Sequence, residues 1–596
     1  MNSSMTLQNS TRITLEWYDY TIFSIMFAVS TSAGIYYGCL GKKQKTISGY
    51  LLGNKRINAL PIALSVAVGH FSAITLMVAP ADVYKYGAFQ WLGCISMVLL
   101  VILSVYIYFP VFFNLQLTSA YEYLERRFDK KTKLLASILY LLCEFIFLAV
   151  AVYTPSLALS TSTGIHVHLI SSTTCAICVF YTAIGGLQTV VWTDLFQFGV
   201  IIVSMLTVSI IGTISSGGFI SVWENALKGD RLNIFDFDPN PTKRDSFWTY
   251  FFGYTAHFTN YISLTQSGLQ KFLALPTFRE SVWSVIYVAI SLSIVYTFIV
   301  FIGLLMYAQY SKCDPFTRKK IQRHEQILPY YIMDVAGHVP GVSGFFLVAL
   351  FCASLSTISS SLNGIAGVIY KDFLYKFLNE NIKEKTVTNI LKLIVALCGI
   401  AIIGLVLIMQ HLGDIIPLAT SIAAMSQGPS MGMFTLGVLF PKANAEGAFY
   451  GAIGGFIFTA SIGMPLKFYN LEKTFAYPSK SLSVENCSAS NQTAEFEFQH
   501  INHSLVQSST SSPYFASKRK RTEEKLPPFM FRISHFYHTF LGALVTVMLG
   551  LVISYFTNKG DSITDKTFLT PFVHKFVPHK LDKREMQNLV KHTRNK

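Results

Sequence analysis

The residues best suited to chemistry are oxygen-bearing side chains inside an apolar stretch. Residues 354–363 read Ser-Leu-Ser-Thr-Ile-Ser-Ser-Ser-Leu-Asn, which places six hydroxyls and an amide within ten residues. Small polar residues also let helices pack closely in membranes. The chemical alternative is a sodium site, because Na⁺ exchanges its water shell for oxygens and neutral hydroxyls bind it weakly enough to release it.

A hydroxyl-based sodium site needs further oxygens, and segment 58–80 can supply them. Pro61 lies near its start, Gly69 in its middle and Pro80 at its end. Glycine and proline weaken a helix, and carbonyls freed by a break are tolerated in a bilayer only where they line a cavity. The segment is therefore either a kinked packing helix or the broken partner of the hydroxyl-rich stretch.

Ionisable side chains within the apolar stretches are few. Those that stand out are His70, Glu144, Asp194 and His257, with Asp82 and Lys85 at the end of one stretch. Such residues mark functional sites in membranes, although a lone histidine also serves as a hydrogen-bonded packing residue. The set is too thin for metal or nucleophilic chemistry, so an enzyme is not predicted. Apart from Lys392 near the start of segment 389–409, no lysine or arginine falls inside a predicted span, which fits both an anion held by helix N-termini and a neutral solute.

The paired glycines Gly185 and Gly186 predict a short turn between two apolar segments, and Thr193 is suited to cap the helix that follows. Asp194 is then either a first-turn residue favoured by the helix dipole or a negative charge near a bound cation.

The elements that position these residues are membrane spans. Hydrophobic side chains make up 52% of the 596 residues and charged ones only 13%, about half the share usual in soluble proteins. This excludes most soluble enzymes, disordered scaffolds and disulfide-framework proteins, and the nine scattered cysteines form no framework or ligand cluster. Thirteen apolar segments are predicted to cross a bilayer: 17–38, 58–80, 89–112, 134–156, 166–185, 193–215, 247–267, 282–308, 345–370, 389–409, 414–439, 446–464 and 534–556.

The net charge of +15 is attributed to basic cytoplasmic loops rather than to nucleic-acid binding. Loops 41–56, 114–133 and 371–388 carry five, five and four lysines or arginines, whereas the intervening short loops carry only Lys85. The N-terminus is therefore predicted outside and the C-terminus inside. Five glycosylation sequons fall on the predicted outer side, at Asn2, Asn9, Asn486, Asn491 and Asn502.

These boundaries divide the chain into five parts. They are an extracellular tail (1–16), a transmembrane core with twelve spans (17–464), a long glycosylated extracellular loop (465–533), a last span (534–556) and a poorly ordered cytoplasmic tail (557–596).

Four short stretches of the sequence resemble motifs of the sodium/solute symporter family. The resemblance as a whole covers roughly residues 15–560. The block 185–197 is similar to the family hallmark G-G-x-x-x-V-x-x-T-D-x-x-Q, and Leu355-Ser356-Thr357 resembles its sodium helix. Residues 266–274 resemble its Q-x-x-x-Q-[RK] segment. Residues 80–87 resemble the P-S-E-x-Y-x-[YF]-G stretch of the iodide, vitamin and monocarboxylate branch.

The resemblance implies an all-α polytopic fold with a LeuT-like core of two inverted five-helix repeats, spans two to six and seven to eleven. It also implies a sodium site made of the carbonyls of Ala63 and Val66 and the hydroxyls of Ser356 and Thr357, with Asp194 close by. The solute is expected beside the broken helices, at His70, Phe71, Thr75 and Gln266. Gly69 and Thr75 replace a serine and a glutamine of the iodide transporter pattern, so the resemblance alone does not establish iodide selectivity or a second sodium site.

The expected function is a plasma-membrane symporter that couples sodium entry to import of a small organic monocarboxylate or related anion by alternating access. Na⁺ is the coupling ion and no other cofactor is expected. The partners are the solute and the lipid bilayer, without nucleic acid, and the sequence sets no oligomeric state. A transporter of biotin, pantothenate or iodide, a sodium leak channel and a non-transporting nutrient sensor remain alternatives.

Overall fold

The computed structural model describes residues 16–37, 46–117, 119–318, 320–321, 324–337, 339–378, 382–409, 415–471, 477–483, 527–557 and 565–576. Within these ranges the chain forms helices and contains no strand. The α-helices are α1 (Trp17–Ile35), α2 (Ile47–Leu52), α3 (Ala59–His70), α4 (Ala73–Tyr86), α5 (Gly93–Leu103), α6 (Phe109–Leu115), α7 (Glu122–Arg127), α8 (Lys130–Thr163), α9 (Val167–Ser215), α10 (Phe219–Lys228), α11 (Thr255–Phe258), α12 (Gln266–Leu273), α13 (Phe278–Tyr310), α14 (Ile327–Ala336), α15 (Val342–Val368), α16 (Glu384–Met409), α17 (Ile415–Leu439), α18 (Ala445–Leu471) and α19 (His538–Thr557). An all-helical fold is what hydrocarbon demands, because helices satisfy their own backbone polar groups.

Eight helices in the described ranges are long and apolar enough to cross a membrane, or nine if the bent pair α3 and α4 counts as one span. The thirteen predicted apolar segments coincide with these long helices and with other helices of the described chain. Segment 247–267 is an irregular stretch made of the π-helical η5 (Thr249–Tyr254), α11, the π-helical η6 (Thr259–Leu264) and the start of α12. The first span of each predicted five-helix repeat is therefore interrupted, at Phe71 and at Thr265.

The helix α9 contains two predicted spans in one continuous element. Its 49 residues would extend about 74 Å, far more than a hydrocarbon core of about 30 Å. Gly186 divides it, with a φ of 55° and a ψ of −156° that only glycine adopts easily. Thr193 donates to the carbonyls of Thr189 and Val190, both at 3.0 Å. It lies inside the second helix, and the prediction that it caps that helix is wrong.

Two further expectations need correction, and one disulfide-bonded cysteine was not predicted. The helix α18 continues to Leu471, so the segment 465–533 begins as helix. Residues 565–576 of the tail pack on the core, because the Thr570 amide and hydroxyl donate to the carbonyls of Val438 (3.1 Å) and Tyr106 (2.8 Å). Cys313 is disulfide-bonded. The predicted glycosylation sites Asn2, Asn9, Asn486, Asn491 and Asn502 lie outside the described residues.

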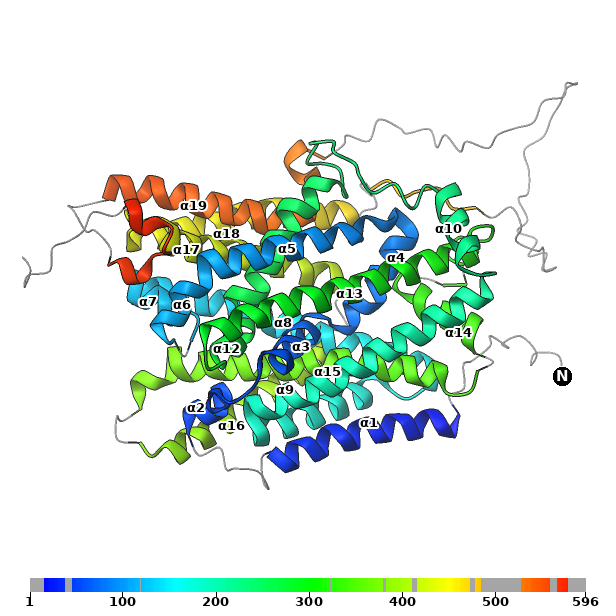
Figure 1. Ribbon diagram of the computed structural model, residues 1–596, viewed down its shortest axis with the longest axis horizontal. Coiled ribbons are helices and arrows are strands. Elements are labelled where there is room, and N and C mark those ends of the chain that lie inside the picture. The colour runs from blue at the N-terminus through cyan, green and yellow to red at the C-terminus, as the bar shows by residue number, and fades with distance from the viewer. Residues whose placement is uncertain are drawn as a thin grey trace, which may run out of the picture.

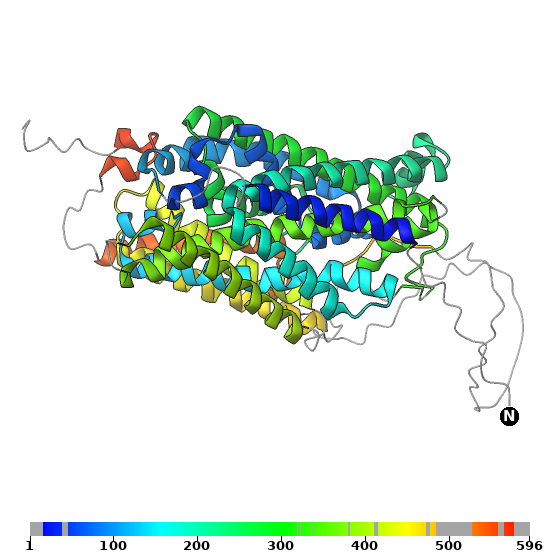
Figure 2. The same cartoon turned by 90° about the horizontal axis from the view of Figure 1, so that it is seen from below.

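The helices lie mainly side by side along the long axis of the molecule (Figure 1). Helices α17, α18 and α19 pack on one another at one edge, and α1 lies at the opposite edge against α9 and α15. The view from below shows the same long bundle (Figure 2). The hydroxyl-rich α15 is central, and every residue from Phe346 to Val368 is buried. It contacts α3, α4, α8, α9 and α12.

Close packing of α13 on α4 depends on Gly303. A Cβ atom there would lie 2.5 Å from the Val83 Cβ and 2.8 Å from the Pro80 carbonyl oxygen. We expect Gly303→Val to destabilise the protein by about 1–3 kcal/mol through overpacking, measured as the midpoint of thermal unfolding in detergent. Gly199→Val is the matched control, because nothing lies within 4 Å of that position. Equal shifts in both variants would show that α13 does not rest on α4 in this way.

Candidate functional site

The centre of the site is a break between two helices. The helix α3 ends at His70, Phe71 has the extended φ and ψ of −83° and 100°, and α4 continues at an angle of 66°. The break confirms the sequence prediction for segment 58–80. It frees backbone carbonyls that cannot complete helical hydrogen bonds in a membrane interior.

Two hydroxyls of α15 meet these carbonyls. Ser356 Oγ lies 3.2 Å from the Val68 oxygen, and Thr357 Oγ1 lies 3.1 Å and 3.4 Å from the Gly69 and Phe71 oxygens. Both hydroxyls also reach the Ala353 carbonyl within their own helix, at 2.9 and 3.0 Å. Each can therefore donate its proton to Ala353 and turn its lone pairs toward a cation.

The predicted ligands Ala63 and Val66 lie earlier on α3 and are buried. The hydrogen bonds of Ser356 and Thr357 to the α3–α4 break go to Val68, Gly69 and Phe71 instead. A role for the Ala63 and Val66 carbonyls in sodium binding stays a prediction.

Asp194 belongs to α9 and is fully buried. It faces α15 about one helical turn beyond Ser356 and Thr357, at Ser359 and Ser360. Its Oδ2 accepts from Ser65 Oγ (2.6 Å) and Ser360 Oγ (3.2 Å), and it forms an ion pair with Lys271 Nζ at 3.3 Å. Ser359 Oγ reaches Oδ1 at 3.5 Å. The prediction that Asp194 binds sodium is left untested, but its charge is already matched by Lys271.

Lys271 is the residue that sequence reasoning missed. It lies on α12 just beyond the predicted span 247–267, yet it is 2% exposed. Its ammonium also donates to the Ser65 carbonyl (2.9 Å) and Ser360 Oγ (2.7 Å). An added Cβ on Gly69 would lie 3.5 Å from Lys271 Nζ and 3.2 Å from Ser360 Oγ, so the glycine leaves room for this pair. The expectation that no lysine lies within the membrane core is wrong.

A cavity of about 300 Å³ opens beside the same break. It is lined by α4, α8, the irregular segment 249–264, α17 and the start of α19. His70 Nδ1, Ser72 Oγ and Gln90 Oε1 contribute buried polar atoms that have no hydrogen-bond partner among the described residues. Buried polar atoms need partners, so the cavity is built for a polar ligand or water.

The predicted solute residues divide into two groups. His70 and Thr75 line the cavity. Phe71 is buried behind it, packed on the rings of His70 and Tyr296 at 5.8 and 5.5 Å. Gln266 is not part of the lining, because it accepts from the Ala120 amide at 2.6 Å and donates to Gln270 at 3.0 Å.

The cavity wall also contains Glu144 and His257, the two remaining ionisable residues of the sequence analysis. His257 Nδ1 lies 2.8 Å from Gln427 Oε1, and its ring lies 5.9 Å from that of His70. At one end Asp82 lines the cavity and pairs with Arg244 at 2.6 Å. Arg244 also pairs with Asp245 at 2.8 Å and stacks over the Tyr86 ring at 3.8 Å. Within the described part of the chain, no lysine or arginine lines the cavity.

The architecture is that of a polytopic membrane transporter. It combines many apolar helices, a broken helix met by polar side chains, and a cavity beside the break. The family model for the sodium:solute symporter family matches residues 50–455. The chain is 33% identical to sodium-coupled monocarboxylate transporter 1 of Xenopus laevis, over 93% of this chain and 87% of that protein. It is 34% identical to sodium-coupled monocarboxylate transporter 2 of Bos taurus, over 92% and 85%, and 34% identical to the sodium-dependent multivitamin transporter of Oryctolagus cuniculus, over 75% and 70%.

The fold is similar to that of a Na⁺-coupled sialic acid symporter in a substrate-bound outward-open state. The TM-score is 0.71 with 22% identity, covering 91% of this chain and 98% of that chain. The chain belongs to the sodium:solute symporter family. It is therefore a transporter with Na⁺ as its coupling ion, and not an enzyme.

The Lys271–Asp194 pair should behave as one buried unit. We expect Lys271→Met and Asp194→Asn each to destabilise the protein by about 3–5 kcal/mol, because each leaves an unmatched buried group. The double variant should lose less than the sum. A double-mutant cycle on the unfolding midpoint measures the coupling. The control cycle uses the exposed pair Lys228 and Glu224 (3.6 Å), where no coupling is expected; strict additivity at 194 and 271 would contradict the prediction.

Proposed function

We propose that this chain imports a small organic monocarboxylate across the plasma membrane together with Na⁺, by alternating access. The substrate class rests on the two sodium-coupled monocarboxylate transporters to which the chain is about one-third identical over most of its length. The multivitamin transporter relative keeps a larger vitamin anion as the second candidate.

The observation that carries the proposal is the contact of Ser356 and Thr357 with the carbonyls of the α3–α4 break. Na⁺ binding there replaces two hydroxyl–carbonyl hydrogen bonds by ion–oxygen contacts and ties α15 to the break. His70 and Ser72, which flank Phe71, line the solute cavity. An ion that fixes the break therefore also fixes one wall of the solute site.

The cavity suits an organic anion that keeps an apolar body. Its wall is mainly aromatic and aliphatic, including Phe147, Tyr254 and Tyr296. The carboxylate of the solute has the imidazoles of His70 and His257 and the Ser72 hydroxyl within the same cavity as hydrogen-bond partners. Glu144 and Asp82 give the wall acidic groups, so a companion Na⁺ is needed to make the site favourable to an anion.

We further propose thirteen spans with the N-terminus outside and the C-terminus inside. The domains are an extracellular tail (1–16), a transmembrane core that begins at residue 17 and ends with α18 at Leu471, a long extracellular loop, a last span (534–556) and a cytoplasmic tail (557–596). The disulfide at Cys313 supports this orientation, because its loop (309–344) is predicted extracellular and disulfides persist in oxidising compartments. The basic loops 114–133 and 371–388 then face the cytoplasm.

Removing one sodium ligand should weaken sodium dependence selectively. We expect Thr357→Ala to raise the Na⁺ concentration for half-maximal uptake about tenfold, because one ion-binding oxygen is lost. Uptake of labelled lactate, pyruvate, butyrate, biotin, pantothenate and iodide in oocytes, in sodium and choline media, provides the measurement. Thr297→Ala is the control, since its exposed hydroxyl donates to the Ser293 carbonyl within its own helix α13. A Thr357 variant with reduced surface expression but unchanged sodium affinity would contradict the site.

The energetics predict an accompanying current. One Na⁺ crossing ~60 mV gains about 1.4 kcal/mol, and a tenfold gradient adds about 1.4 kcal/mol. A monoanion entering against the same potential loses about 1.4 kcal/mol, so one Na⁺ concentrates it only about tenfold and two about a thousandfold. We expect at least two Na⁺ per anion and a net inward current under voltage clamp. Solute uptake without current would overturn this stoichiometry.

A further inference from the structure

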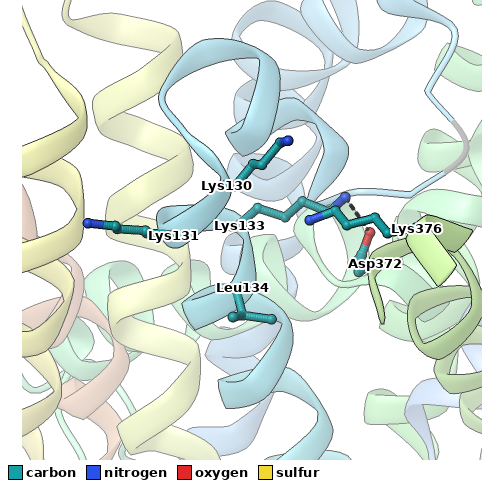
Figure 3. Close-up of a pocket in the computed structure, with 6 residues that line it drawn as sticks. All are labelled: Lys130, Lys131, Lys133, Leu134, Asp372 and Lys376. Carbon is teal, nitrogen blue, oxygen red and sulfur yellow. Dashed lines mark ion pairs between the residues drawn. The ribbon is translucent and has the colours of Figure 1, made fainter. Parts of the chain in front are cut away.

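A second polar pocket lies at the ends of two membrane helices, and it shares no lining residue with the solute cavity. Helix α8 begins at Lys130, and the span that contains α15 continues through η8 (Ile369–Leu374) to Phe377. Between these ends is a pocket of about 150 Å³, lined by Lys130, Lys131, Lys133, Leu134, Asp372 and Lys376 (Figure 3).

One lysine of the pocket is neutralised and forms its floor. Lys133 is buried and pairs with Glu125 at 2.6 Å and Asp372 at 3.1 Å. Asp372 also accepts from Ser137 (2.9 Å) and Ser119 (3.2 Å). The carboxylates here are therefore already engaged and held in place.

The other ammonium groups remain available. Lys130, Lys131 and Lys376 are exposed, and none of them forms an ion pair within the part of the chain that the structure describes. The side chain of Lys376 reaches toward that of Lys133, with Lys130 above them, while Lys131 points away (Figure 3). Partial burial opposes ionisation of Glu125, but Lys133, Lys376 and Lys130 outweigh it and lower the pKa of that carboxyl. The four lysines that line the pocket outnumber the nearby carboxylates of Asp372, Asp129 and Glu125. The net charge around the pocket is therefore positive.

An apolar track continues from the pocket. Leu134, at its rim, is followed by Ile138 and Leu142 at spacings of four residues, and their exposures are 43%, 48% and 50%. Residues four apart share one face of a helix. A ligand with a polyanionic head in the pocket can therefore lay a hydrocarbon chain along α8.

We propose that this pocket binds an anionic phospholipid whose headgroup carries more than one phosphate. Lys130 and Lys376 hold the phosphates, and Leu134, Ile138 and Leu142 contact an acyl chain. Basic pockets at the cytoplasmic ends of membrane helices suit such headgroups, and the proposed orientation puts this pocket on that side. The lipid joins the start of α8 to the end of α15, the helix that carries Ser356 and Thr357.

The proposal is tested on the purified full-length chain in neutral detergent, with fluorescent short-chain phosphatidylinositol bisphosphate as the probe. We expect Lys130→Gln/Lys376→Gln to weaken binding about 25-fold, because each lysine near a membrane surface contributes about fivefold. The matched control is Lys383→Gln/Lys385→Gln, which removes two exposed lysines at the start of α16. The control should change affinity less than twofold. Equal losses in the two double variants would overturn the proposal, because they would show diffuse charge attraction.

A second arm separates a lipid from a soluble phosphate. Inositol trisphosphate should compete only weakly, and Leu134→Asn should weaken the lipid probe without weakening that competition. If inositol trisphosphate binds as tightly as the lipid, or if Leu134→Asn has no effect on the lipid, the pocket takes a free anion and the lipid assignment fails. Folding of each variant is checked by its unfolding midpoint.

Discussion

The structure depends on how carbonyl groups released inside a membrane protein find partners. At the α3–α4 break the regular helical hydrogen bonding ends near Gly69 and Phe71, while the Val68 carbonyl still accepts from the Phe71 amide at 3.1 Å, and no water is available in hydrocarbon to replace the lost bonds. Ser356 and Thr357 on α15 supply donors at 3.1–3.4 Å. The same groups exchange readily for a cation, because a hydroxyl is both donor and acceptor. The hydroxyls can thus satisfy the carbonyls of the break without an ion, and they can bind a cation in exchange.

A second polar layer lies next to the first. Lys271 and Asp194 form a neutral pair bridged by Ser65 and Ser360. The pair connects α3, α9, α12 and α15, the elements around the proposed cation site. A single unpaired charge there would be costly. The matched pair instead leaves the electrostatic potential at the neighbouring hydroxyls close to zero. Sodium affinity can then stay moderate, which release on the inner side requires.

The sequence predicted the parts of this arrangement that local patterns encode. The hydroxyl run of α15 and the break in segment 58–80 were readable, because composition and Gly or Pro positions act within one helix. The family was also readable from short motifs. The positions of Gln266 and Lys271 were not, because the interruption at Thr265 decides where α12 points. Thr193 was misjudged for a similar reason: one positive φ at Gly186 lets the next helix start earlier than a glycine pair suggests.

If Na⁺ and the solute bind at the proposed sites, they are coupled through shared backbone rather than through a long pathway. The Phe71 carbonyl contacts Thr357, while its neighbours His70 and Ser72 line the cavity. A ligand shifts a conformational equilibrium only by its differential affinity for the two states. Two ligands that both require the same three residues in one conformation necessarily favour each other, and that reciprocity is the thermodynamic content of symport. A site for Na⁺ placed elsewhere on α15 would need an additional moving element to achieve the same coupling.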